Sequence, residues 1–211
     1  MNQKSHLLPF LAVFAALATP ACANRPSDRV ARDVTTVKSE RTPDKLVARG
    51  VAFAGVGDLT RAEQYFAAAL DAGADPNVVL PKLLRVCITS GNHLAAINYA
   101  APLLQRHPDD ADLRFVVAEL RAVTGDTQGA RADLQHVVDL APDEPAPHFA
   151  YARLLKDKVG DPAGADREFR AYLRVAPEGE HAEESRSSLL LAVAIQANPV
   201  TPTVHMKKVK R

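Results

Sequence analysis

A repeat of about 34 residues constrains this chain more than any other feature of its sequence. Glycine recurs at Gly57, Gly91, Gly125 and Gly160, at spacings of 34, 34 and 35 residues. The same period is kept by Ala62, Ala96, Ala130 and Ala165, by Phe66, Ala100, Leu134 and Phe169, by Ala69, Leu103, Val137 and Tyr172, and by Pro108, Pro142 and Pro177. Self-similarity at a period of roughly 20 to 50 residues is typical of stacked structural units, so we expect about four of them.

Each unit has the pattern of a helical hairpin. In the first, Gly57 can end one helix, and Asp58 can cap the next by accepting hydrogen bonds from its free N–H groups. Ala62, Phe66 and Ala69 then recur at helical spacing and define one apolar face. The chain has no Trp and only 5% aromatic residues, which suits close-packed helices better than a sheet.

The repeat resembles a known family, the tetratricopeptide repeat, through Leu46, Gly50, Phe53, Gly57, Ala62, Phe66 and Ala69. The resemblance implies an all-α, right-handed α-solenoid of helix-turn-helix units. It covers residues 42–177, in four units at about 42–76, 77–108, 109–142 and 143–177. We expect residues 178–197 to form a C-terminal capping helix, because a solenoid must cover the open face of its last unit.

Three departures from the repeat are local. Arg121 in the third unit stands where the first unit has Phe53, and the fourth unit has one extra residue within 156–159. The second unit has Pro81 in or near its first turn and Pro102 inside its second helix. Because Pro102 cannot donate to the carbonyl of Asn98, we expect that helix to bend or to lose about 3 kcal/mol.

The N-terminal segment has the layout of an export signal, with Lys4 followed by an apolar stretch from Leu7 to Ala18. Residues 1–21 are interpreted as a signal peptide and 22–41 as a flexible tether. Two processing sites overlap: cleavage after Ala23, or cleavage before Cys22 at a sequence that resembles a lipobox, with lipidation of Cys22. We expect an exported, periplasmic protein, anchored by lipid, more in the outer membrane than the inner, if Cys22 is modified. Cys87 is expected to be a small buried apolar residue.

The sequence contains no signature of common catalysis. HExxH, GxSxG, CxxC and GxxxxGK are all absent, and the histidines lack ligand spacing. We therefore expect no catalytic residues, no metal and no cofactor. Without Lys4 and the four cations of the 198–211 tail, 21 basic residues face 25 acidic ones, which does not suit nucleic acid. The basic tail is interpreted as a solvated terminus, with contact to anionic lipid as the alternative.

The tetratricopeptide resemblance implies a concave groove lined by the first helix of each unit. Its residues would be Val47, Val51, Arg85, Ile88, Phe115, Glu119, Phe149, Arg153 and Lys156. Phe115 and Phe149 could each belong to the groove or to the core. Some family members grip a terminal carboxylate with Lys and Asn early in the groove, where this chain has Val47 and Val51, so we do not expect that mode.

The functional hypothesis is a non-catalytic scaffold or adaptor of the bacterial cell envelope that binds a protein or peptide in the groove. The alternative is a chaperone-like accessory subunit that holds an exported client protein.

Overall fold

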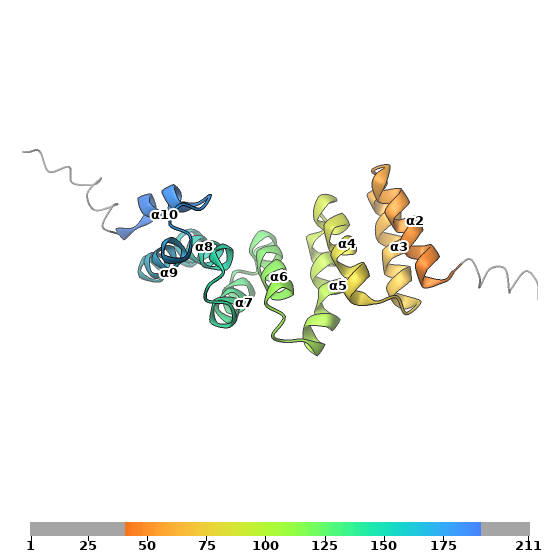
Figure 1. Cartoon of the computed structure of the whole chain (residues 1–211), viewed down its shortest axis with the longest axis horizontal. Helices are drawn as coiled ribbons and strands as arrows, with labels where there is room; N and C mark the ends of the chain where they lie inside the picture. Colours follow the sequence, from red (N-terminus) through yellow and green to blue (C-terminus); the bar gives the residue numbers. More distant parts are fainter. Residues whose placement is uncertain (1–40, 191–211) are drawn as a thin grey trace, which may run out of the picture. The chain divides into compact units, whose positions relative to one another are not determined.

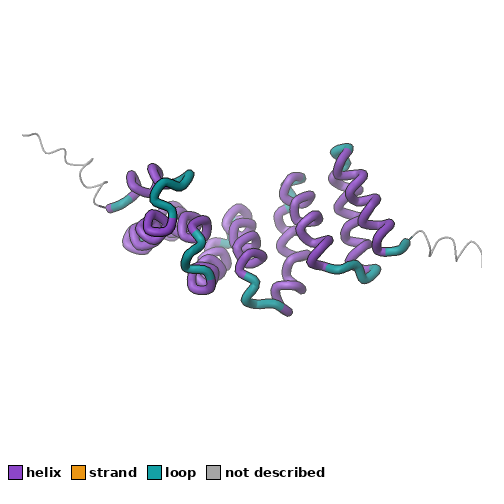
Figure 2. Tube along the Cα trace, viewed as in Figure 1, coloured by secondary structure: helices purple, strands orange, loops and turns teal. Residues whose placement is uncertain are grey.

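The structure, a computed structural model, describes residues 41–190 of the chain, which comprise helices joined by short loops without any strand (Figure 2). Consecutive helices lie side by side from α2 to α10 (Figure 1). Their bounds are α2 Pro43–Gly55, α3 Leu59–Asp71, α4 Pro76–Thr89, α5 His93–Arg106, α6 Ala111–Thr124, α7 Thr127–Leu140, α8 Pro145–Leu154, the π-helical turn η1 Leu155–Val159, α9 Pro162–Val175 and α10 Ala182–Ser188.

The predicted helical repeat is confirmed, with four helix pairs: α2–α3, α4–α5, α6–α7 and α8–α9. The second unit begins slightly earlier than predicted, because Asp75 caps α4 and Pro76 is its first residue. The predicted signal peptide at 1–21, nearly all of the tether and the basic tail lie outside the described residues. None of the described helices is long and apolar enough to cross a bilayer.

The repeated glycine is the left-handed residue that ends each turn within a unit. The four glycines of the period have φ between +75° and +88°, a region that side chains disfavour. The next residue then caps the second helix in three units, through Asp58, Asp126 and Asp161. From the polar residue that follows Gly91 we also expect a side-chain cap at Asn92, and this expectation is wrong, since the Asn92 side-chain amide instead donates to Glu63 of α3, at 3.3 and 3.4 Å.

Small residues set the close approach of paired helices. The repeated alanines Ala62, Ala96 and Ala130 have no exposed surface, and Ala165 is 3% exposed. In the first unit, a Cβ added to Gly50 would stand 2.7 Å from the ring of Phe66. The burial of the four alanines and the close approach at Gly50 agree with the register predicted from the sequence.

Helix α6 belongs to both apolar clusters of the described chain. Leu113, Val117 and Leu120 pack in the cluster formed by the first two units, whereas Ala118 packs in the cluster of the last two. Cys87 is buried in the first cluster as predicted, and burial raises the pKa of its thiol to about 11. That thiol is therefore protonated at neutral pH and acts as a packing residue.

The two interior prolines do not end their helices. Pro81 lies inside α4 and not in its first turn, because the helix begins at Pro76. Helix α5 continues past the exposed Pro102 to Arg106, whose Nε donates to the Pro102 carbonyl at 3.2 Å. The helix thus continues for a further turn although the Asn98 carbonyl has no donor at residue 102.

The C-terminal cap is shorter in the described residues than the predicted 178–197. Helix α10 covers only Ala182–Ser188 and packs against α9, with Ala182 and Leu189 joining the second apolar cluster. The chain is tied to α9 just before α10, where the His181 amide donates to the Tyr172 hydroxyl at 2.9 Å. Residues 191–197 lie outside the described part.

One contact between the two helices of a unit changes its chemistry along the chain. In the first unit it is apolar: Phe53 of α2 stacks on Tyr65 of α3, with ring centroids 5.3 Å apart and an interplanar angle of 7°. Leu46 lies seven residues before Phe53 on α2. It is buried and packs in the same apolar cluster. Aromatic pairs of this kind are worth about 0.5–1.5 kcal/mol beyond the area they bury.

In the third unit the equivalent positions, two 34-residue periods later, are Arg114, Arg121 and Asp133. Asp133 is only 4% exposed, and its two carboxylate oxygens accept from Arg114, at 2.7 Å, and from Arg121. Arg114 also donates to the Pro108 carbonyl, at 2.6 and 3.1 Å. The departure at Arg121 is therefore matched by a change at its partner position.

The fourth unit has a related polar contact between His148 of α8 and Glu168 of α9. Nδ1 of His148 lies 2.7 Å from Glu168, and Nε2 lies 3.0 Å from the Pro142 carbonyl. With an oxygen acceptor at each nitrogen, both must donate, which only the protonated ring can do. The hydrogen bond to Glu168 raises the His148 pKa above 6.5, against the opposing effects of burial and of Arg174.

We predict that the arginine–aspartate contact can be exchanged for its apolar equivalent. Asp133→Ala should cost about 3 kcal/mol of unfolding free energy, because two arginines lose a buried partner. The triple change Arg114→Leu, Arg121→Phe, Asp133→Tyr should recover most of that loss, because a packed apolar contact can replace a buried ion pair. Urea unfolding measures both, with Asp143→Ala at an exposed position as the control. A triple variant no more stable than Asp133→Ala would show that the two contacts are not equivalent.

We also predict a pH-dependent contribution from His148. Because its folded pKa is raised, the stabilisation is fully present below the unfolded pKa of 6.5 and is lost as pH rises through the folded value. The wild type should therefore exceed His148→Gln in unfolding free energy by more at about pH 5.5 than at about pH 8.5. His107→Gln, at an exposed position, is the control. An equal difference at both pH values would contradict the protonated contact.

Candidate functional site

The predicted groove residues fall into three places in the structure. Val47 is half-buried and packs against the first apolar cluster, while Val51 is 49% exposed on α2. The others, except Lys156, are shared between two pockets formed by successive first helices. Neither Val47 nor Val51 lines these two pockets.

The first of these, the α4–α6 pocket, has a volume of about 530 Å³ and lies between α4 and α6. It contains two predicted residues, Arg85 and Ile88, on α4. Most of its wall is apolar, and polar groups stand at Asn77, Thr89, Asp110 and Asp112. Its apolar lining is Pro76, Leu80, Pro81, Leu84, Ile88, Leu103, Leu113 and Val116.

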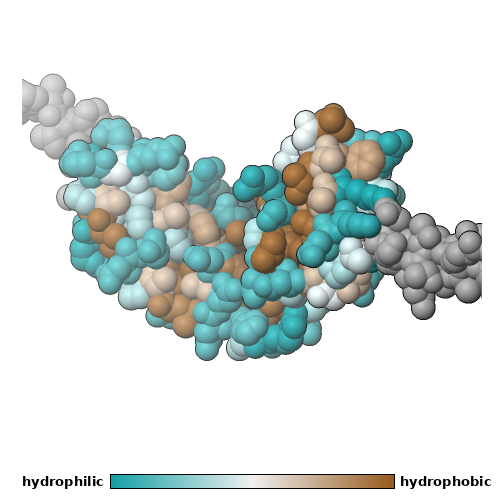
Figure 3. Space-filling model, turned by 45° about the vertical axis from the view of Figure 1, so that its right-hand side comes forward, coloured by the Kyte–Doolittle hydropathy of each residue, from teal (hydrophilic) through white to brown (hydrophobic). Residues whose placement is uncertain are grey.

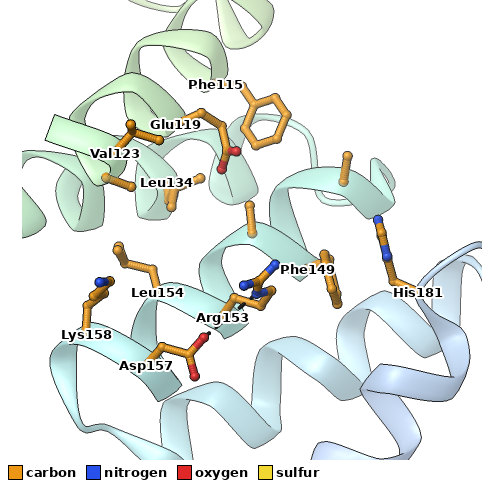
Figure 4. A pocket seen from close by; sticks show the side chains of 13 residues that line it. Phe115, Glu119, Val123, Leu134, Phe149, Arg153, Leu154, Asp157, Lys158 and His181 are labelled. Carbon is orange, nitrogen blue, oxygen red and sulfur yellow. Dashed lines mark ion pairs between the residues drawn. The ribbon is translucent and has the colours of Figure 1, made fainter. Parts of the chain in front are cut away.

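The second, the α6–α8 pocket, has a volume of about 590 Å³ and brings four predicted residues together. Phe115 and Glu119 come from α6, and Phe149 and Arg153 come from α8 (Figure 4). Sequence reasoning did not identify the rest of the lining, which is Ala122, Val123, Leu134, Ala146, Ala150, Leu154, Asp157, Lys158 and His181. Charged groups therefore stand around an apolar interior in both pockets.

The structure answers the question left open for the two phenylalanines. Phe149 is only 7% exposed and belongs to the second apolar cluster. Its ring stacks on His181, with centroids 3.9 Å apart, and lies 5.6 Å from Tyr172. Phe115 is half-buried against the same cluster and also faces the pocket. Phe149 is thus chiefly a core residue, and Phe115 serves both core and pocket.

The structure does not bring Lys156 to the pocket with its predicted neighbours. Its Nζ donates to Ser188 at 3.0 Å and lies 6.0 Å from the centre of the Phe169 ring. The cause is the extra residue of the fourth unit, which is accommodated in the π-helical turn Leu155–Val159. The wider turn changes the face on which each later residue lies, so Asp157 and Lys158 line the pocket instead.

Ion pairs orient the charged groups of the α6–α8 pocket. Nε of Arg153 lies 3.8 Å from Asp157 and 3.9 Å from Glu184 of α10, and its guanidinium lies 6.0 Å from the centre of the Phe149 ring. The side chains of Arg153, Asp157 and Glu184 are about half exposed, so these pairs contribute little to stability. They direct the cation toward the carboxylates of Asp157 in η1 and Glu184 in α10.

The surface is mixed in character. In the face shown in Figure 3, apolar surface lies in the hollowed middle of the view and is bordered by hydrophilic surface. Exposed large apolar residues occur at the groove positions Val51, Ile88 and Val123. The described residues contain no group of three or more His, Cys, Asp or Glu side chains that could hold a metal ion. Binding of an apolar and charged segment is the chemistry that these pockets can provide.

Comparison with known proteins agrees with this architecture. A family model described as Tetratricopeptide repeat matches residues 88–145, which run from the end of α4 to the start of α8. No curated protein matches the sequence.

Solved structures of similar fold cover most of the chain. A tetratricopeptide repeat protein from Parabacteroides merdae ATCC 43184 matches with a TM-score of 0.64 and 20% identity over 72% of this chain, which spans 60% of that protein. MamA from Desulfovibrio magneticus RS-1 matches with a TM-score of 0.58 and 18% identity, over 73% of this chain and 93% of that one. YrrB, a TPR protein with an unusual peptide-binding site, matches with a TM-score of 0.62 and 15% identity, over 76% and 85% of the two chains.

At these identities the likeness to solved structures concerns the fold. The family model, the four helix pairs and the 34-residue register describe the same architecture. Residues 88–145 therefore match the tetratricopeptide-repeat family, and the described part of the chain has the fold of a tetratricopeptide-repeat α-solenoid.

Proposed function

We propose that this protein is a non-catalytic scaffold that binds a segment of another protein in the groove between its first helices. The observation that carries the proposal is the pair of pockets between α4 and α6 and between α6 and α8. Both share α6, both have apolar walls, and both have charged groups at their edges. Such a surface suits an extended segment whose apolar side chains enter the pockets and whose polar groups remain in water.

A structural neighbour supports the proposal by analogy. YrrB has the same fold and is described as having a peptide-binding site, although its 15% identity carries no residue-level correspondence. The proposal therefore depends on the pockets of this chain and takes from the neighbour only that the fold is compatible with peptide binding.

We place this function in the bacterial cell envelope. The support comes from the sequence, where an apolar segment with the layout of an export signal ends beside Cys22. Cleavage before Cys22 followed by lipidation would anchor the repeats at a membrane from the periplasmic side. The partner would then be a protein or peptide of an envelope assembly.

Lipid attachment can be tested directly. Labelled fatty acid should enter the wild-type protein and not Cys22→Ser, because a lipobox cysteine is the attachment point. Cys87→Ser is the matched control, since its buried thiol should not be modified. Label that remains in Cys22→Ser would contradict lipidation at this residue.

The binding surface can be tested by affinity capture from envelope membranes with exposed groove variants. Phe149 is unsuitable because it is a core residue, whereas Ile88 is 43% exposed and Val123 is 66% exposed. The double variant Ile88→Asp, Val123→Asp should lose at least about 2 kcal/mol of partner affinity, roughly 30-fold. Leu94→Asp on α5, at 65% exposure and outside both pockets, is the control and should retain the partner.

The same experiment separates the scaffold from its alternatives. Deletion of residues 207–211 should change capture little, and any change should vanish at high salt, which screens exposed charges. One partner retained through a salt wash supports the scaffold, whereas weak binding of many unrelated apolar peptides would favour the client-holding alternative. Loss of capture by Leu94→Asp with retention by the double variant would contradict binding in the groove.

A further inference from the structure

The α6–α8 pocket contains one carboxylate without a partner. Within residues 41–190, Glu119 of α6 makes no hydrogen bond and no ion pair. Its side chain points into the pocket between Phe115 and Val123 (Figure 4). An ionised carboxylate has acceptor sites on two oxygens, and the residues that the structure describes supply no donor to them.

The arginine of the pocket, Arg153, pairs with other carboxylates and not with Glu119. It reaches Asp157 and Glu184 at 3.8 and 3.9 Å, and its guanidinium lies over the ring of Phe149. Figure 4 shows its ion pair with Asp157 on the side away from Glu119. Arg153 acts on Glu119 only through longer-range attraction, which lowers the pKa of that carboxyl.

Burial has the larger effect and raises the Glu119 pKa above 4.5. Glu119 is exposed at the mouth of the pocket, so the protein atoms beside it remove only part of the hydration of its carboxylate. A carboxylate with reduced hydration gains more from an incoming cation than one in bulk water, because the effective dielectric constant around it is lower.

The charges around the pocket also favour a positively charged ligand. Glu119 and Asp157 in the pocket and Glu184 at its edge provide three carboxylates, against two cations, Arg153 and Lys158. The charges of the pocket lining therefore cancel, and Glu184 adds one negative charge at the edge. The interior remains apolar because Leu134, Leu154 and the rings of Phe115 and Phe149 line it.

We propose that the α6–α8 pocket selects a partner segment that carries a lysine or arginine beside an apolar side chain. The cation pairs with Glu119, and the apolar side chain enters between Phe115, Val123 and Leu154. The inference rests on the proposed function, since it names the chemistry of the segment that the groove binds.

The test uses three blocked peptides, Ala-Ala-Leu-X-Leu-Ala-Ala, in which X is Lys, Leu or Glu. They are titrated into the full-length protein and followed by amide NMR shifts of α6 and α8. The Lys peptide should bind about tenfold tighter than the Leu peptide, and the Glu peptide should bind most weakly, as expected for one charge-assisted contact. The largest shifts should surround Glu119.

Matched variants assign the preference to Glu119. Glu119→Gln should remove the advantage of the Lys peptide, and Glu119→Lys should transfer it to the Glu peptide. Glu180→Gln removes a carboxylate at an exposed position outside the pocket and should leave the preference unchanged. Circular dichroism of each variant verifies that the helices persist.

The outcomes separate the inference from the proposed function. Equal binding of all three peptides, with shifts on α6 and α8, would overturn the selectivity and leave groove binding intact. Absence of shifts in the groove with every peptide would contradict both. If the Lys peptide binds only after deletion of residues 207–211, the chain's own basic tail occupies the pocket, and the inference of an external partner is overturned.

Discussion

The contact between the two helices of each unit is the interaction on which the rest of the structure depends. It fixes the position of the first helix, and the first helices form the pocket walls. In the first unit the contact is a stacked pair, Phe53 on Tyr65, and in the third Asp133 joins two arginines. The repeat conserves the position of this contact while its chemistry changes from apolar to ionic.

Sequence periodicity predicted the parts of the fold that depend on local geometry. Left-handed Gly57 and its equivalents, and the buried Ala62 series, follow from turn conformation and from helix spacing, which recur identically in every unit. The site was less predictable because it depends on side-chain direction after irregular turns. The extra residue near Lys156 was visible in the sequence, but the π-helical turn that absorbs it was not. The partner of Arg121 could have been found by comparing position 133 with Tyr65 in the same register.

Two features of the site came only from the folded chain. His181 lies beyond the fourth unit, and it reaches Phe149 because the loop before α10 folds back against α9. Phe149 then becomes a core residue, although its spacing on α8 matched a groove position. Two residues of α8 therefore have different roles. Phe149 fixes the pocket wall by packing in the core, and Arg153 provides the positive charge of that wall. Helix α6 links the two pockets, because its residues line both.

Site-specific photocrosslinking tests most directly whether these pockets bind a protein segment. A photoreactive amino acid is placed singly at Ile88, at Val123 and, as the off-groove comparison, at Leu94, all of which are exposed apolar positions. The account predicts that irradiation of envelope membranes links the same partner protein to the probes at positions 88 and 123, and not to the probe at 94. Crosslinks that form from position 94 while both groove positions stay unlinked would contradict it.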